Sequence, residues 1–465
     1  MGRTGLRDAL LGVVGPAGLL EGDAIGAAFH EDIGHERTGR PWLVLRPADT
    51  AQVSRCLRLL HEAGQPTVPQ GGMTGLVSAG TPADGEVVLS LRRMTAIEEI
   101  DGASATLIAQ AGTPLQSVQE AADAAGFFYP LDIGSRGSCT VGGNLATNAG
   151  GNRVLRYGMA RDLVLGLEAV LADGTVLDGM HKMTKNNAGY DLKQLFIGSE
   201  GTLGVITRAV LKLHPRPASQ AVAFCALPDF GAALSLLGFL RGALGGRLSA
   251  FEALWANAYA LIIDKVPRVR PPLPPGRPFY LLVESLGADP ESDSAAFERS
   301  LGQAIERGLV EDAVVATSQR EIQELWAVRD AVSEAVLALD PFLSYDVSMP
   351  QSSMDDFGRA VIGAIATQFP SARTGVFGHI GDGNIHIVTD GGGRDTPRHR
   401  VDSIVYDATR AVRGSVSAEH GIGFQKRQWL GNTRTPQEIA VMRQLKHCLD
   451  PKGILSPGRI FPADS

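Results

Sequence analysis

DIGSRGSCTVGGNLATNAGG, residues 132–151, is the most informative segment of the sequence, with six glycines set among Ser, Thr and Asn. Two shorter segments have the same character: PQGGMTGLVSAG (69–80) holds four glycines and IGSEGTLG (197–204) holds three. Glycine permits positive φ and removes the Cβ that would block a ligand, and exposed backbone N–H groups in such loops suit phosphate oxygens. Three loops of this kind favour a large anionic cofactor over three unrelated tight turns.

The whole chain agrees with this interpretation. Glycine makes up 56 of 465 residues, about 12% against an average near 7%. The length predicts about two to four domains with sizeable cores. No GxGxxG follows the first expected strand and no GxxxxGK[ST] occurs, so the sequence predicts neither a Rossmann dinucleotide fold nor a P-loop.

Charge and cysteine content exclude several classes of protein. Lys and Arg number 43 and Asp and Glu 50, for a net charge of −7, which disfavours nucleic acid and anionic membranes as partners. The four cysteines do not have metal-ligand spacing, which favours a reducing compartment, and we expect a cytoplasmic protein. No apolar run reaches the roughly 18–20 residues that span a bilayer, and the first 20 residues are typical of an amphipathic helix more than of a signal peptide.

The rhythm of apolar runs divides the chain into four parts. We expect an N-terminal helical segment (1–40), a domain with all three glycine loops (41–217), a second domain (218–420) and a C-terminal segment (421–465) that packs back on the first domain. In the second domain, strands alternate with long helices at about 229–243, 291–307, 319–338 and 352–368, which indicates an α+β fold with an antiparallel sheet. In the first domain, Asp173-Gly174 between two β-rich runs predicts a hairpin.

Histidines and a carboxylate form a second group of interest. GHIGDGNIHI (378–387) holds His379 and His386, which would lie on opposite faces of one straight strand, but the glycines between them can turn the chain. SAEHGIG (417–423) adds Glu419 and His420. Two imidazoles and a carboxylate suit a zinc-like ion with open positions, while buried or surface histidines without a metal remain the alternative.

The glycine loops, together with RYG (156–158) and the longer run IGSEGTLGVIT, resemble the FAD-linked oxidases of the vanillyl-alcohol oxidase/p-cresol methylhydroxylase type. The resemblance extends over about residues 40–460 and is nearest to the branch with D-lactate and D-2-hydroxyglutarate dehydrogenases. It implies an α+β fold, with a two-subdomain FAD-binding domain, a substrate (cap) domain that has an antiparallel sheet, and a C-terminal helical segment. Some relatives bind FAD through a histidine; the first two glycine loops have none, so non-covalent FAD is expected.

The resemblance also implies which residues contact FAD. They belong to the three glycine loops and their flanks: Pro69, Gly71, Gly72, Met73, Thr74, Gly75, Leu76, Pro130, Leu131, Asp132, Gly134, Ser135, Ser138, Thr140, Gly142, Gly143, Asn144, Thr147, Asn148, Gly150, Gly151, Tyr157, Glu200, Gly201, Gly204 and Ile206. The first loop would wrap the pyrophosphate, the second would line the flavin and ribityl track, and the third would lie near the adenine half.

The resemblance assigns chemical roles to the second group as well. His379, His386 and Glu419 would hold a divalent metal, for which zinc is the expected ion, and His420 would take the hydroxyl proton because imidazole titrates near neutral pH. Arg329, in the amphipathic run ELWAVRDAVSEAV (324–336), would grip the substrate carboxylate in place of lying exposed on a helix. Asn384 would lie near the reacting centre, with Ser333 and Tyr345 as substrate contacts.

Three positions depart from the hydroxyglutarate pattern. Ser333 stands where those relatives have threonine, Ser344 where they have lysine, and Val388 where they have asparagine. The lysine and asparagine would help to hold a second carboxylate. A D-lactate-like or longer monocarboxylate is therefore favoured as substrate, and D-2-hydroxyglutarate is the alternative.

The predicted function is an FAD-dependent dehydrogenase that oxidises a D-2-hydroxy acid to the 2-oxo acid by hydride transfer to flavin N5. Electrons would pass to an electron-transfer flavoprotein, a quinone or a cytochrome, and a homodimer is the default expectation. One rival is an alkyl-dihydroxyacetone-phosphate synthase, whose histidine-rich run is absent here. Another is a non-catalytic FAD-binding subunit, which would lack the histidine group or the second domain.

Overall fold

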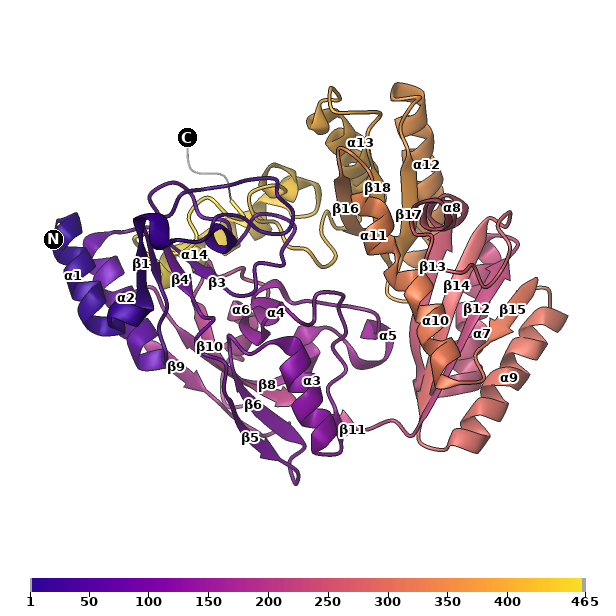
Figure 1. The fold of residues 1–465 in the computed structure, drawn as a ribbon, viewed down its shortest axis with the longest axis horizontal. Coiled ribbons are helices and arrows are strands. Elements are labelled where there is room, and N and C mark those ends of the chain that lie inside the picture. Colours follow the sequence, from indigo (N-terminus) through magenta and orange to yellow (C-terminus); the bar gives the residue numbers. More distant parts are fainter. Residues whose placement is uncertain (1, 462–465) are drawn as a thin grey trace. The chain divides into compact units, whose positions relative to one another are not determined.

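The computed structural model describes residues 2–461 and divides into two compact units. Unit 1 comprises residues 1–150, 158–216 and 419–465, and unit 2 comprises residues 151–157 and 217–418. The first 40 residues and the C-terminal segment thus belong by their contacts to the unit that carries the glycine loops. Figure 1 labels the elements of both units.

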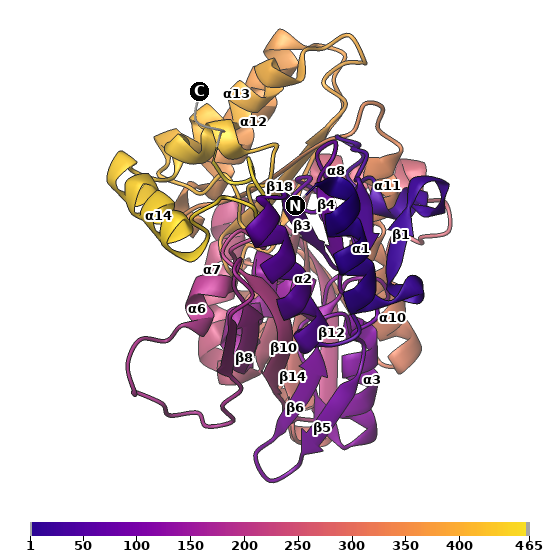
Figure 2. The ribbon, with the colours of Figure 1, turned by 90° about the vertical axis from the view of Figure 1, so that its left-hand side faces the viewer.

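A four-stranded sheet forms the first layer of unit 1, in the order β1-β2-β4-β3. Its strands are β1 (Leu19–Glu21), β2 (Leu43–Leu45), β4 (Val87–Ser90) and β3 (Thr67–Gln70), of which the last three are parallel. Helices α1 (Arg3–Val14) and α2 (Thr50–Ala63) lie side by side (Figure 2). Asp49 accepts a hydrogen bond from the Gln52 N–H, and Gly64 ends α2 with a positive φ, so polar caps fix both helix ends.

A five-stranded antiparallel sheet forms the rest of the unit 1 core, in the order β5-β6-β10-β8-β9. Its strands are β5 (Ile97–Asp101), β6 (Thr106–Gln110), β10 (Val205–Lys212), β8 (Val164–Val170) and β9 (Val176–Gly179). The hairpin predicted at Asp173-Gly174 is confirmed: Gly174 has φ 86°, and a Cβ there would lie 2.5 Å from the Ser54 carbonyl oxygen. Shorter elements complete the unit: α3 (Leu115–Ala124), β7 (Phe127–Phe128), α4 (Val141–Thr147), α6 (Lys193–Phe196) and β11 (His214–Pro215).

The C-terminal segment is integrated into the first sheet. After α14 (Pro436–Leu449), the Ile454 carbonyl accepts the Thr67 N–H at 2.8 Å, and the Ser456 N–H donates to the Thr67 carbonyl at 2.8 Å. These bonds extend the edge strand β3 by a short parallel bridge. The end of the described chain therefore supports β3, the strand that leads into the first glycine loop.

Unit 2 is built on one seven-stranded sheet in which every neighbouring pair is antiparallel, as predicted for this domain. In spatial order the strands are β15 (Asp312–Val315), β12 (Ser219–Leu227), β14 (Phe279–Gly287), β13 (Leu248–Trp255), β17 (Thr374–Gly378), β18 (Asn384–Thr389) and β16 (Leu343–Ser348). The helices are α5 (Val154–Tyr157), α7 (Phe230–Leu244), α8 (Ala256–Lys265), α9 (Pro290–Glu306), α10 (Gln319–Asp330), α11 (Val332–Leu337), α12 (Met354–Gln368) and α13 (Arg398–Ala411). Of all helices described, none combines the length and the hydropathy that a membrane crossing requires.

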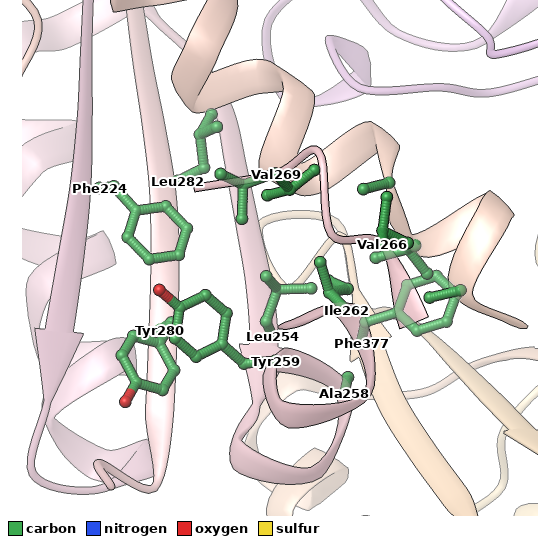
Figure 3. Packing of buried hydrophobic residues seen from close by; sticks show 14 of the residues in the cluster. Phe224, Leu254, Ala258, Tyr259, Ile262, Val266, Val269, Tyr280, Leu282 and Phe377 are labelled. Carbon is green, nitrogen blue, oxygen red and sulfur yellow. The ribbon is translucent and has the colours of Figure 1, made fainter. Parts of the chain in front are cut away.

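One face of this sheet packs against α8, α10 and α11. Leu254, Tyr280 and Phe377 project from the strands toward Tyr259 and Ile262 of α8 (Figure 3). The Tyr259 and Tyr280 rings lie 4.0 Å apart, centroid to centroid. Because side chains alternate along a strand, Glu252 and His386 project from the same face as Leu254 and Phe377. The core therefore fixes the strands that present the candidate site.

Candidate active site

The β17–β18 hairpin brings His379 and His386 to the same face. Phe377 pairs with His386 in the register, and His379 lies two residues after Phe377, immediately past the end of β17. Gly383 in the turn has φ 88°, and a Cβ there would lie 2.6 Å from the Met349 carbonyl oxygen, so glycine is required. The two imidazole rings lie 5.4 Å apart at 80°, with nitrogen atoms within 4.8 Å of one another. A hairpin turn thus accounts for how two histidines seven residues apart converge.

Glu252 of β13 connects the first histidine to an arginine. Its carboxylate accepts hydrogen bonds from His379 Nδ1 at 2.7 Å and from Arg329 Nε at 2.9 Å. Glu252 is 1% exposed, so burial tends to raise its pKa, but the adjacent His379 and Arg329 outweigh burial and hold the pKa of Glu252 below its usual value. Sequence reasoning missed this residue, because β13 was not among the expected strands.

Arg329 is buried, unlike an ordinary helix-surface arginine. It lies near the end of α10, is 8% exposed, and has its guanidinium carbon 5.3 Å from the centre of the Phe377 ring. Among residues 2–461, the only hydrogen bond of its side chain is the one from Nε to Glu252. The two terminal nitrogens therefore retain the fork of N–H groups that suits a carboxylate.

Asn384 and Asp346 continue the polar row across the sheet. Asn384 Nδ2 donates to Asp346 Oδ1 at 2.8 Å and to the Val347 carbonyl at 3.1 Å. Asn384 Oδ1 is buried and has no partner within the described chain, so it can accept a hydrogen bond from a bound molecule. Asp346 Oδ2 accepts the backbone N–H of Ala418 at 3.1 Å, and Ala418 is the last residue of unit 2.

Two expected substrate contacts lie elsewhere in unit 2. The Tyr345 side chain projects from the face opposite to His386, is fully buried, and donates its hydroxyl to Asp402 at 2.8 Å. Ser333 is exposed on α11, because the expected helix 319–338 breaks into two at Ala331. These placements argue against direct contact of either side chain with a ligand beside Arg329.

In unit 1 the first two glycine loops pack tightly against each other. A Cβ on Gly71 would lie 2.4 Å from Thr140 Oγ1, and one on Gly72 would lie 2.1 Å from the Ser138 carbonyl oxygen. Both glycines are thus required for the approach of two loops, in addition to any approach of a ligand. Asn144 Nδ2 beside them is buried without a partner among the described residues, as expected of a donor that awaits a bound group.

The other residues expected to contact FAD lie along the three glycine loops and their flanks in unit 1, except for two that belong to unit 2. The second loop leads through the cap residue Thr140 into the short helix α4, which ends at Asn148 with φ 52°. Gly151 and Tyr157 belong by their contacts to unit 2, where α5 packs against β13.

Glu200 has a structural task that the sequence did not reveal. Its carboxylate accepts the backbone N–H groups of Ile422 at 2.7 Å and Gly423 at 2.8 Å, and burial raises its pKa. Each carboxylate oxygen therefore accepts one backbone N–H group within the protein. Glu200 fixes the segment that directly follows His420.

Glu419 and His420 begin the C-terminal part of unit 1, immediately after Ala418 in the chain. A Cβ on Gly150 would lie 2.1 Å from Glu419 Oε1. The Glu419 carboxylate therefore lies directly against Gly150, near the end of the second loop. Within unit 1, the expected metal ligand Glu419 therefore adjoins the expected flavin loop, and the expected base His420 is the next residue in the chain.

Comparison with known families agrees with this division into a cofactor unit and a second unit. The FAD binding domain family matches residues 41–179, and the family of FAD linked oxidases, C-terminal domain, matches residues 216–460. The chain belongs to the FAD-linked oxidases, as the resemblance of its glycine loops predicted.

Several curated proteins are similar over most of the chain. Bovine mitochondrial D-2-hydroxyglutarate dehydrogenase is 42% identical over 91% of this chain and 77% of its own length. D-2-hydroxyglutarate dehydrogenase of Xanthomonas citri pv. viticola is 36% identical, over 91% and 90%. A putative mitochondrial D-lactate dehydrogenase of Schizosaccharomyces pombe is 36% identical, over 92% and 84%.

Solved structures share the fold at low sequence identity. p-Cresol methylhydroxylase with substrate bound superposes with a TM-score of 0.77 at 14% identity, covering 99% of this chain and 98% of that one. Alkyldihydroxyacetonephosphate synthase superposes with a TM-score of 0.76 at 18% identity, covering 98% and 86%. The expected α+β architecture of the p-cresol methylhydroxylase type is confirmed.

The expected cytoplasmic location is wrong for much of this family. The bovine, rat and Arabidopsis thaliana relatives and the yeast protein are all named as mitochondrial, whereas the Xanthomonas relative is not. The cysteine content indicates a reducing compartment but does not distinguish the cytoplasm from the mitochondrion.

Proposed function

We propose that the protein is an FAD-dependent dehydrogenase that oxidises a D-2-hydroxy acid to the corresponding 2-oxo acid. The observation that carries the proposal is the pairing in unit 2 of a buried arginine, Arg329, with the two convergent imidazoles of His379 and His386. A guanidinium recognises a carboxylate, and imidazoles suit a metal that binds a hydroxyl. The substrates named for the relatives, D-2-hydroxyglutarate and D-lactate, carry both groups.

FAD is proposed to bind non-covalently along the glycine loops of unit 1. The unpartnered Nδ2 of Asn144 supports this placement, and the first two loops contain no histidine to which the flavin could be attached. Bound flavin supplies the acceptor for the hydride from substrate C2. Denaturation of the purified protein is expected to release FAD into the supernatant; flavin that stays with the precipitate would contradict non-covalent binding.

A divalent metal, with zinc as the expected ion, is proposed to bind His379, His386 and Glu419. The donor set fits, because the Glu252 carboxylate can only accept, so His379 carries its proton on Nδ1 and has Nε2 in the form that binds metal. The metal would lower the pKa of the substrate hydroxyl. His420 would take the hydroxyl proton, Arg329 would orient the carboxylate, and Asn384 Oδ1 would accept a hydrogen bond near the reacting carbon.

A monocarboxylate is the favoured substrate. Ser344 and Val388, which replace the lysine and asparagine of the hydroxyglutarate pattern, face each other across β16 and β18. Val388 is 1% exposed and packs within the apolar cluster of unit 2, so it offers no partner for a second carboxylate. D-2-Hydroxyglutarate is the second candidate, favoured by the names of the relatives at 36–42% identity.

Electrons are proposed to leave the flavin to an acceptor other than NAD, such as an electron-transfer flavoprotein, a quinone or a cytochrome. A homodimer is the expected assembly. The assignment of the substrate does not depend on the electron acceptor or on the homodimer.

The decisive experiment is anaerobic mixing of the yellow holoprotein with a panel of D- and L-2-hydroxy acids, followed by flavin absorbance. We expect bleaching by D-lactate or longer D-monocarboxylates at lower concentration than by D-2-hydroxyglutarate, and none by the L-enantiomers. Preference for D-2-hydroxyglutarate would move the assignment to the second candidate. Absence of bleaching by every acid would overturn the proposed function.

A further inference from the structure

We propose that Glu252 is a positioning residue that holds the substrate-binding arginine and a metal-binding histidine in one fixed arrangement. The carboxylate lies between the two, with one bond to Arg329 Nε at 2.9 Å and one to His379 Nδ1 at 2.7 Å. The inference rests on the proposed function of those two residues. It adds a residue that no family resemblance assigned.

The first argument concerns the proton of His379. A carboxylate has no proton to donate, so the short contact requires the imidazole N–H at Nδ1. Nε2 then carries the lone pair, and the ring cannot rotate without loss of the bond to Glu252. A carboxylate behind a metal-binding imidazole fixes the ring orientation and increases its basicity.

The second argument concerns Arg329. With Nε engaged by Glu252, the two terminal nitrogens present their N–H groups on the side away from that carboxylate. The Phe377 ring, 5.3 Å from the guanidinium carbon, restricts the plane of the same group. Phe377 also stacks on His386 at 4.9 Å between centroids, so one ring contacts both the arginine and the second histidine.

The third argument is that burial makes this arrangement costly unless it is used. Glu252 is 1% exposed and Arg329 8%, and removal of such charges from water requires several kcal/mol that the ion pair only partly recovers. Leucine or methionine at both positions would fill the volume without that cost. What distinguishes Glu252 from Glu284, another buried carboxylate of this sheet, is its second partner, because Glu252 also binds His379.

Glu284 on the neighbouring strand β14 provides a matched control. It projects from the same face, is fully buried, and is likewise bound to a guanidinium, with Arg153 Nε at 2.9 Å. Its remaining partners are Ser249 at 2.8 Å and Gln220 at 2.8 Å, none of which the proposed chemistry uses. Glu284→Gln therefore reports the cost of neutralising a buried carboxylate in this sheet at a position that forms no bond to Arg329 or His379.

The test compares Glu252→Gln, Glu284→Gln and the parent as zinc-loaded holoproteins. A glutamine at position 252 has one acceptor oxygen for two donors, and its NH₂ group faces the other donor. We expect zinc transfer to a colorimetric chelator to become about 10–100-fold faster in Glu252→Gln. At saturating zinc, the dissociation constant for pyruvate, read from the flavin spectrum, should still rise about tenfold or more because Arg329 has lost its support.

Glu252→Asp gives a second measure if the glutamine variant does not fold. Its carboxylate is withdrawn by one methylene and cannot span both donors, so zinc release should again be accelerated. Zinc release and pyruvate affinity equal to those of Glu284→Gln would overturn the inference. A parent protein that binds no zinc, or whose flavin no hydroxy acid reduces, would instead refute the proposed function.

Discussion

Buried carboxylates organise the polar interior of both units, and each has a different set of partners. Glu252 and Asp346 order the candidate site in unit 2, and Glu200 orders the segment after His420 in unit 1. Asp32 of unit 1 is 3% exposed and accepts the Ser78 N–H at 2.7 Å, inside the first glycine loop. These side chains are where single substitutions have the clearest consequences.

Asp32 is expected to make the stability of the protein depend on pH. Burial raises its pKa to about 6, against the backbone N–H groups that lower it. The folded chain therefore holds a proton that the unfolded chain releases near pH 4, and this contribution to stability is lost as the pH rises toward 6. Asp32→Asn, which never ionises, should gain up to about 3 kcal/mol in the free energy of unfolding relative to the parent between pH 4 and pH 8.

The measurement is urea unfolding of parent and variant at both pH values, with the exposed Asp23→Asn as control. The control should show the same difference from the parent at pH 4 and pH 8. An Asp32→Asn difference that is also independent of pH would show that folding does not raise the pKa of Asp32.

Substitution of His420 is expected to slow the reaction without weakening cofactor binding. As the proposed base it takes the hydroxyl proton, a contribution typically worth about 10²–10⁴-fold in rate. His420→Ala should therefore slow anaerobic flavin reduction by that factor, with bound FAD unchanged in the absorbance spectrum. An unchanged rate of reduction in stopped flow would remove His420 from the mechanism.

Among the elements, the segment 419–423 is held by side-chain bonds and belongs to no helix or strand. Glu200→Gln leaves one acceptor for the two N–H groups of Ile422 and Gly423. Loss of a charge-assisted bond of about 1.5–3 kcal/mol should raise amide exchange in this segment about tenfold or more. Hydrogen–deuterium exchange by mass spectrometry measures it, with the exposed Glu62→Gln as control. Equal exchange in the two variants would show that Glu200 does not hold the segment.

The sequence predicted elements well where local chemistry specifies them. The turn at Asp173-Gly174 and the glycine turn between His379 and His386 both follow from residues whose conformational preference is strong. The antiparallel sheet of unit 2 followed from the alternation of strands and helices.

The sequence could not predict on which face of a strand a given side chain would project. In β13, LSAFEALW, one charged residue stands in an apolar run, and nothing local shows that Glu252 points at an arginine 77 positions away. Tyr345 was assigned to the substrate, yet the register of β16 turns it to the opposite face. No glycine or proline marks the break at Ala331. The sequence therefore predicted one helix over residues 319–338, where the structure has α10 and α11.

Over the whole molecule, the proposed cofactor and metal residues divide between two units. The FAD residues belong almost entirely to unit 1, whereas of the proposed metal ligands His379 and His386 belong to unit 2 and Glu419 to unit 1. Because none of the proposed metal ligands is also an expected FAD contact, we expect that the metal can be removed while flavin stays bound. The two matched families together extend over residues 41–179 and 216–460, so both units contain residues that belong to a known family.

Chelation tests this separation. If the proposed metal is bound, dialysis of the holoprotein against a chelator should remove it and slow anaerobic flavin reduction at least about 100-fold, since a metal that holds the substrate hydroxyl would stabilise the developing alkoxide by several kcal/mol. The flavin spectrum should remain, and added zinc should restore the rate. Full activity in metal-free protein, confirmed by elemental analysis, would exclude a metal from the mechanism.

The hairpin that carries both histidines imposes a strict requirement on length. Side chains alternate along β18, so one residue inserted or deleted between the turn and His386 would exchange the two faces of the strand. The imidazole would then point toward Tyr345 and α13, and Ile387 or Ile385 would take its place beside His379. A substitution in this hairpin can weaken the site by a small or a large amount. Insertion or deletion of one residue, in contrast, would separate the two histidines completely.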